Sequence, residues 1–184
     1  MDRVQTKPLN NRRVLHGVFQ PIFKTETPKI PAADINVEML RSILQGEKFA
    51  PGSIAAFPED FVVSAIRPWK VLGYQVCASP DQQTLTDYFF KKKFTARRNQ
   101  LLTLILMIVE KGFFPLPSES EGDTARMIFP YTRILRTAHG PRSGDAFSQV
   151  SNFALIPSDG RWLLREELNP DFLRPGELLV LLEK

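Results

Sequence analysis

The sequence contains only one cysteine, Cys77, and two histidines, His16 and His139, among 184 residues. A single cysteine cannot form an intramolecular disulfide, and these three side chains cannot supply the four ligands of a structural zinc site. The composition therefore predicts a fold that is held together by its hydrophobic core. Such scarcity of cysteine is typical of a reducing compartment.

Signatures of several common catalytic sites are also absent. The chain has no glycine-rich phosphate loop, nucleophile elbow or HExxH helix, and no acidic residue stands two positions before a lysine. Cys77 with a histidine can form a nucleophile and base, but its apolar neighbours favour a small core residue. His139 lies in a polar loop with Arg136 and Arg142, where it can bind phosphate or act as a general acid. We expect no cofactor and no metal, and an enzyme is the least favoured class.

Apolar runs are short. Residues 101–109 form the most apolar one, with Thr103 as its single polar side chain, whereas a helix needs about 20 residues to cross a bilayer. The N-terminus is polar and lacks the apolar segment of a signal peptide. These features predict an intracellular protein, cytoplasmic or nuclear, that is not secreted and has no transmembrane segment.

The same apolar run predicts a buried central helix over residues 95–111. Leucine and methionine dominate it, and both lose little side-chain freedom in a helix. Thr95 can cap its start, and Gly112 stands where a left-handed residue ends a helix. Because the segment is apolar on all sides, it belongs in the centre of a domain. A buried strand over residues 101–109 is the alternative, since periodicity alone does not exclude it.

The remaining pattern places helices first and strands later. Helical signals cover residues 34–46, 57–66 and 80–93, interrupted by a strand pattern over 71–78, in which Cys77 is a candidate for burial. Strands are expected over 127–135 and 177–182, with a hairpin around Asp159-Gly160. This order predicts an α+β fold, in which N-terminal helices precede a C-terminal antiparallel sheet packed on the central buried helix.

Two regions are expected. Residues 1–33 carry six cations, two acidic residues and four prolines, which indicates a basic arm that is extended or disordered in part. Residues 34–184 are expected to form a single α+β domain, helical over 34–112 and rich in strands over 124–184. A chain of this size can bury roughly 70% of its unfolded surface in one core.

The strongest functional signal is a cluster of five cations within residues 91–98, interleaved with Phe90 and Phe94. Basic side chains mixed with aromatic ones suit phosphate contact combined with base stacking. The alternative is that these lysines merely solvate the exposed end of a core helix. The candidate nucleic-acid-binding residues are this cluster, two cations of the arm and two near the 137–145 loop: Lys91, Lys92, Lys93, Arg97, Arg98, Arg12, Arg13, Arg136 and Arg142.

The formal net charge is +4, which is a modest argument for a nucleic-acid partner unless the charge is clustered. The leading hypothesis is a non-enzymatic nucleic-acid-binding or nucleoprotein-associated protein, with DNA or RNA as its partner. The second hypothesis is a protein–protein interaction or assembly subunit that binds a partner or a second copy of itself. The two differ in salt dependence, since phosphate contacts weaken steeply with salt.

Overall fold

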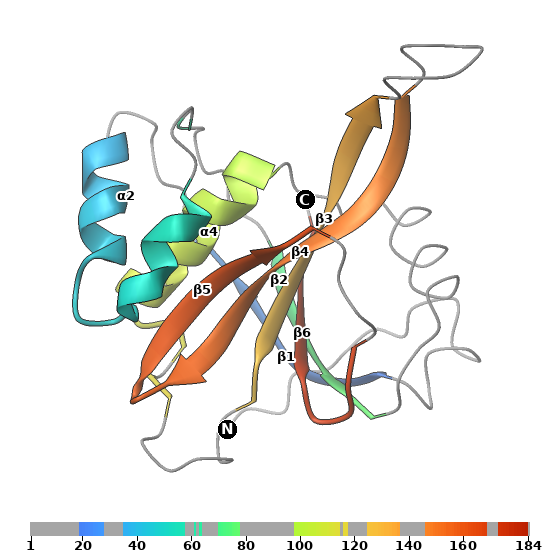
Figure 1. The fold of residues 1–184 in the computed structure, drawn as a ribbon. Helices are drawn as coiled ribbons and strands as arrows, with labels where there is room; N and C mark the ends of the chain where they lie inside the picture. Colours follow the sequence, from blue (N-terminus) through green and yellow to red (C-terminus); the bar gives the residue numbers. More distant parts are fainter. Residues whose placement is uncertain are drawn as a thin grey trace.

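The computed structural model describes residues 19–27, 35–57, 61, 63, 70–77, 98–114, 116–117, 125–136, 146–168 and 173–183. Its main element is a six-stranded sheet in the order β1-β2-β6-β3-β4-β5 (Figure 1). The strands are β1 (Phe19–Glu26), β2 (Lys70–Val76), β3 (Met127–Arg136), β4 (Ala146–Ser158), β5 (Arg161–Glu167) and β6 (Leu178–Glu183). Neighbouring strands are antiparallel except β3 and β6, which are parallel.

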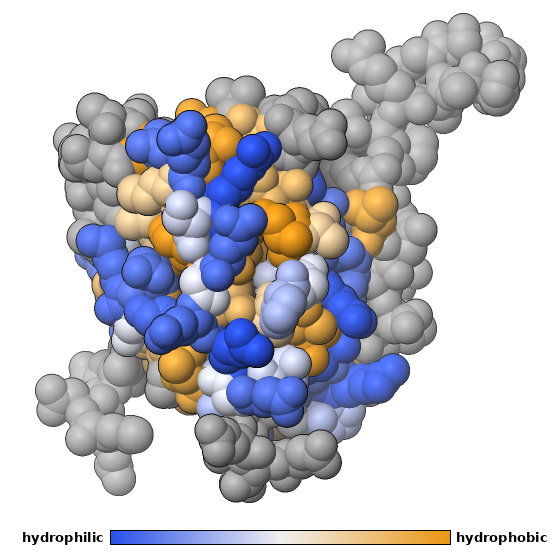
Figure 2. All heavy atoms as spheres, turned by 60° about the vertical axis from the view of Figure 1, so that its left-hand side comes forward, coloured by the Kyte–Doolittle hydropathy of each residue, from blue (hydrophilic) through white to orange (hydrophobic). Residues whose placement is uncertain are grey.

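The helical segments of the described part are short and lie on one side of the sheet (Figure 1). They are α2 (Val37–Leu44), the 3₁₀ helix η2 (Pro51–Ala56) and α4 (Arg98–Glu110). Their apolar side chains share one core cluster with residues of five strands. Figure 2, with that side turned forward, shows hydrophilic residues interspersed with apolar ones over this face.

The predicted fold class is wrong. A mixed sheet dominates the molecule, whereas the sequence predicted N-terminal helices and a separate C-terminal antiparallel sheet. β1 and β2 come before α4 in the chain, and β1 pairs with β2 along nearly its whole length. β1 also falls inside the segment expected as a basic arm, so this part of residues 1–33 belongs to the sheet.

The position of β6 is the physical reason why the observed fold differs from the predicted one. This last strand lies between β2 and β3, so it joins the N-terminal pair of strands to the C-terminal ones. Leu179 and Leu181 face one apolar cluster, while Val180 and Leu182 face the other. A strand that is apolar on both faces needs cover on both faces, and strands in the interior of a sheet commonly have it. It therefore occupies the interior of a sheet.

α4 confirms the predicted helix and excludes the alternative strand. Every residue from 101 to 109 is buried, including Thr103, whose hydroxyl donates to the carbonyl of Asn99 at 2.8 Å. Gly112 has φ +74°, and the amides of Gly112 and Phe113 donate to the carbonyls of Val109 and Ile108. This pair of bonds is the Schellman arrangement, so the helix ends where the sequence indicated.

Local signals elsewhere succeed in part. The hairpin between β4 and β5 turns at Asp159 and Gly160, which have φ +49° and +75° as a two-residue turn requires. α2 is capped by Asn36, whose side chain accepts from the amide of Met39 at 2.8 Å. The prediction that Cys77 is buried is wrong: pairing of β2 with β1 ends at Val76, and the next residue is exposed.

The burial of α4 predicts a large loss of stability when its core side chains are truncated. Ile105 is 0% exposed, so Ile105→Ala removes contacts that the surrounding strands cannot restore. We expect a loss of about 2–5 kcal/mol in the free energy of unfolding, measured by chemical denaturation. Lys111→Ala, at the exposed end of the same helix, is the control and is expected to change it by less than about 0.5 kcal/mol.

Gly73 on β2 gives a second prediction. A Cβ at this position would lie 2.2 Å from the ring of Phe23, its cross-strand partner on β1. Gly73→Ala is therefore expected to destabilise the sheet by about 1–3 kcal/mol, as overpacking does. In a double-mutant cycle, Phe23→Ala should relieve the clash, so the double variant should be more stable than the two single losses predict. Additive losses would contradict this close packing.

Candidate nucleic-acid interface

The structure describes the side chain of only one of the nine candidate residues, Arg98. Arg136 is the last residue of β3, and only its backbone is described. The other candidates lie outside the described residues, as does His139 of the enzyme hypothesis: Arg12, Arg13, Lys91, Lys92, Lys93, Arg97 and Arg142.

Arg98, the first residue of α4, is held against the sheet. Its Nε donates to Oε2 of Glu166 on β5 at 2.5 Å, and its guanidinium carbon lies 5.6 Å from the ring centre of Phe153 on β4. Burial lowers the pKa of Arg98, but the hydrogen bond and the charge of Glu166 raise it by more, so the pKa is raised overall. Arg98 is thus already neutralised within the molecule and fixes the start of α4 on β4 and β5.

Tyr131 of β3 lies beside this ion pair. Its ring stacks on Phe153 with centroids 5.2 Å apart, and its hydroxyl is buried without a hydrogen-bond partner. Burial raises the pKa of Tyr131 to about 12, Glu166 adds to the rise, and Arg98 opposes it. The nearby Ser151 hydroxyl donates instead to the carbonyl of Leu168 at 2.9 Å. The cluster is therefore polar, and the buried hydroxyl of Tyr131 lacks a hydrogen bond within it.

Sequence reasoning missed the partners of Arg98, although a signal for Glu166 exists. Residues alternate between the two faces of a strand, and Trp162 and Leu164 of β5 are both buried in the core cluster under the helices. Glu166 follows at the same spacing, so it lies on the core face of β5. A carboxylate in that position implies a cationic partner, since buried charges are paired.

Beyond this cluster, β3 and β4 continue with no other described strand paired to them. β5 pairs with β4 only from Asn152 to Ser158, and β6 pairs with β3 only at Met127 and Ile128. Residues 131–136 and 146–151 nevertheless remain paired with each other up to Arg136 and Ala146. These twelve residues form a two-stranded ribbon that projects from the sheet (Figure 1).

Pro130 explains where the ribbon leaves the sheet. The carbonyl of Arg126 accepts from the amide of Leu178 on β6, so every second residue of β3 directs its backbone groups toward β6. Ile128 is the next such residue and Pro130 the one after. Proline has no N–H to donate, so the ladder between β3 and β6 stops there.

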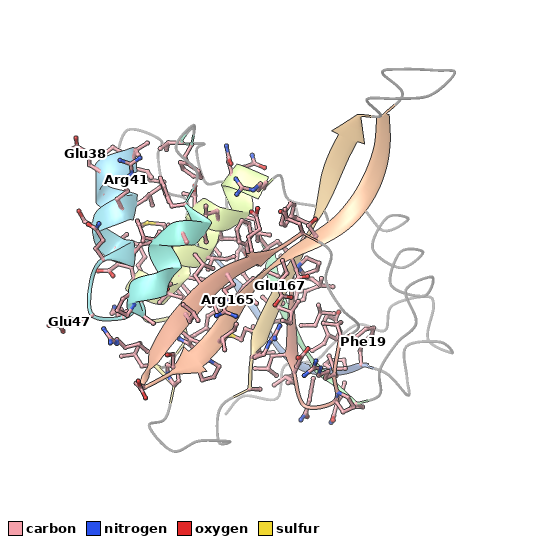
Figure 3. All side chains as sticks on the ribbon, in the orientation of Figure 1. Phe19, Glu38, Arg41, Glu47, Arg165 and Glu167 are labelled. Atoms are coloured by element: carbon pink, nitrogen blue, oxygen red, sulfur yellow. The ribbon has the colours of Figure 1, made fainter. Side chains whose placement is uncertain are left out.

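A second polar cluster lies on the opposite face of β4 and β5. Arg126 donates to Glu167 at 3.0 Å and lies 3.6 Å from Glu177, while Asn152 donates to the other oxygen of Glu167 at 3.0 Å. Glu177 also accepts from the amide of Arg174. Arg165 and Glu167 of β5 are labelled in Figure 3. These bonds connect the end of β5 to the start of β6, so they hold the ends of these two strands together.

In the described part of the chain, no three histidine, cysteine, aspartate or glutamate side chains are grouped so that they can hold a metal ion. None of the described helices is long and apolar enough to cross a bilayer. No family model, curated protein or solved structure matches the chain. Function therefore has to be inferred from the residues and the geometry of the site.

The unpartnered hydroxyl of Tyr131 leads to a prediction about alkaline pH. A phenol whose pKa is about 12 when folded and about 10 when unfolded loses its proton first in the unfolded chain. Its contribution to stability is therefore complete below pH 10 and is lost as the pH rises toward 12. Tyr131→Phe should be as stable as the parent or more stable at neutral pH, since a buried hydroxyl without a partner is costly.

The measurement is the free energy of unfolding of both proteins across this alkaline range. The difference between them should shift in favour of Tyr131→Phe as the pH rises, because other titrating groups cancel in the comparison. A loss of stability at neutral pH would instead show that the hydroxyl makes a bond that holds the cluster together.

Proposed function

We propose that the protein binds nucleic acid, with the basic residues that precede α4 and those of the ribbon forming one interface. The observation that carries this proposal is the attachment of Arg98 at the base of the ribbon. Residues 91–97, which hold the other cations of the cluster, directly precede Arg98 in the chain. Arg136 ends the outgoing strand of the ribbon, about 17 Å from Tyr131 at the usual rise per residue.

In this proposal, candidates that are far apart in the sequence would meet at the same end of the sheet. Residues 137–145, with Arg142, connect the two strands of the ribbon. A two-stranded ribbon fits the major groove of B-DNA, which is about 12 Å wide, while lysines outside the groove contact phosphates. The ribbon would supply Arg136 and Arg142, and the 91–97 segment would supply phosphate contacts.

Arg98 has a different role in this proposal from the one that the sequence suggested. Its guanidinium is already engaged by Glu166 and by the ring of Phe153, so a phosphate would have to compete with both. We assign it the positioning of the basic segment relative to the ribbon. Arg12 and Arg13 stay predictions as additional contacts from the N-terminal segment.

The proposal predicts a steep salt dependence. If Lys91, Lys92, Lys93, Arg97, Arg136 and Arg142 each neutralise one phosphate, the slope of log affinity against log salt is about −5.4 on duplex and about −4.2 on single strands, from about 0.9 and 0.7 for each contact. Arg136→Glu with Arg142→Glu should reduce the slope on duplex by about 1.8. Binding titrations at several salt concentrations measure both values.

The matched control is Arg161→Glu with Arg165→Glu, which makes the same charge change on β5. Arg161 adjoins the turn at the opposite end of β4, about 40 Å along the strand from Ala146. The control should keep the slope of the parent. Equal losses from both double variants would mean that only net charge matters, and undiminished binding by the ribbon variant would remove the ribbon from the interface.

A further inference from the structure

The ribbon has two long edges, and the one formed by β4 has no proline and no charge, and no other described strand pairs with it along residues 146–151. Unpaired strand edges tend to pair with another chain, and proteins prevent this with prolines, charges, bulges or a covering segment. Comparing the edges of this sheet therefore identifies where a second strand can bind.

The outer edge of β5 is covered. The amide of Trp162 donates to the carbonyl of Lys48, and its carbonyl accepts from the amide of Ala50. The amide of Leu164 donates to the hydroxyl of Ser53, at 3.0 Å. The backbone groups along this part of the edge are thus satisfied within the molecule.

The outer edge of β1 is protected by its sequence. Pro21 has no N–H, and the register with β2 shifts between Pro21 and Phe23. Lys24 and Glu26 add exposed charges along the same strand. Each of these features disfavours the docking of a further strand.

The two edges of the ribbon also differ in how well they are protected against pairing with a further strand. The β3 half, residues 131–136, contains Arg133 and Arg136 and follows Pro130. The β4 half, residues 146–151, reads Ala-Phe-Ser-Gln-Val-Ser and has no charge and no proline. Its register with β3 runs without a bulge over all six residues. Short neutral segments of this kind pair readily with their own copies.

The direction of the backbone groups on β4 follows from those of β5. The backbone groups of Trp162 and Leu164 are bonded on the side away from β4. Those of Leu163, which lies between them, are therefore directed toward β4, where Leu163 pairs with Ile156. Even-numbered residues of β4 thus direct their N–H and C=O groups away from β3. Along the ribbon these residues are Ala146, Ser148 and Val150, and among the described residues no strand pairs with them on that side.

We propose that residues 146–151 of β4 pair antiparallel with the same residues of a second copy of the chain. A two-fold axis brings identical strands together in antiparallel register, and one such edge per chain closes the assembly at a dimer. Three facing pairs, each exchanging two hydrogen bonds, would give about six new backbone bonds.

A second copy is the partner that the charge pattern fits. The chain has a formal net charge of +4, and a contact between two copies through uncharged strands places no like charges against each other. Pairing through β4 joins the two neutral edges and leaves Arg133 and Arg136 of each chain on the outermost strands. The resulting four-stranded ribbon is compatible with nucleic-acid binding, because the β3 strands are not part of the new contact.

The test is the oligomeric state of the full chain after nuclease treatment, measured by sedimentation at several protein concentrations and at low and high salt. We expect a dimer that dissociates on dilution and is insensitive to salt, because the new bonds join neutral backbone groups. Ser148→Pro should make the protein monomeric, since it removes an outward N–H without removing a bond to β3.

Thr132→Pro is the matched control, because its N–H is directed toward the β3 edge of the same ribbon. It should remain dimeric, and thermal melts should show that both variants are folded. If Ser148→Pro does not fold, Ser148→Lys provides a charged edge and should also be monomeric. A parent that is monomeric at all concentrations, a dimeric Ser148 variant, or dissociation caused equally by Thr132→Pro would overturn the proposal.

Discussion

The two-faced burial of β6 is the constraint on which the rest of the fold depends. Leu179 and Leu181 pack into one apolar cluster and Val180 and Leu182 into the other, so water has to be excluded from both faces. The strand can meet this requirement only in the middle of the sheet. Its insertion between β2 and β3 joins strands that are about 50 residues apart in the chain into one core.

The ion pair between Arg98 and Glu166 fixes how the start of α4 packs against β4 and β5. The start of α4 carries a cation that cannot be buried alone, and the core face of β5 carries an anion with the same restriction. Their bond satisfies both and sets Arg98 over Phe153. Replacement of either group by a neutral one would leave its partner without a counter-ion, so this pair fixes the start of α4 against β4 and β5.

The sequence predicted what local chemistry determines. Gly112 ends α4 and Asp159-Gly160 turns the hairpin because only such residues adopt positive φ at low cost. The apolar run of α4 predicted its burial, since no other environment suits nine such residues. In each case a few neighbouring residues contain the whole physical cause.

The sequence did not predict pairings between distant segments. The five apolar residues of β6 indicate a strand but do not identify β2 and β3 as its neighbours, and a parallel pair leaves no turn signal between the strands. β1 was missed because its exposed residues do not alternate with buried ones as in a half-buried strand. For the candidate site, only the alternation of Trp162, Leu164 and Glu166 indicated in the sequence that Glu166 lies on the core face of its strand.

The ribbon exists because Pro130 lacks a hydrogen-bond donor, and its two edges suit two different partners. Pro130 ends the ladder between β3 and β6, so the remaining hairpin extends from the sheet, and no other strand of the described part pairs with it. Isolated two-stranded hairpins are only marginally stable in water, so a partner that bound along this one would also stabilise it. The basic β3 strand and its loop suit a polyanion, whereas the neutral β4 strand suits an identical strand. The two proposed partners would use opposite edges, so a dimer would present two copies of the same basic edge to a single nucleic acid, and binding at both would exceed the affinity of either alone.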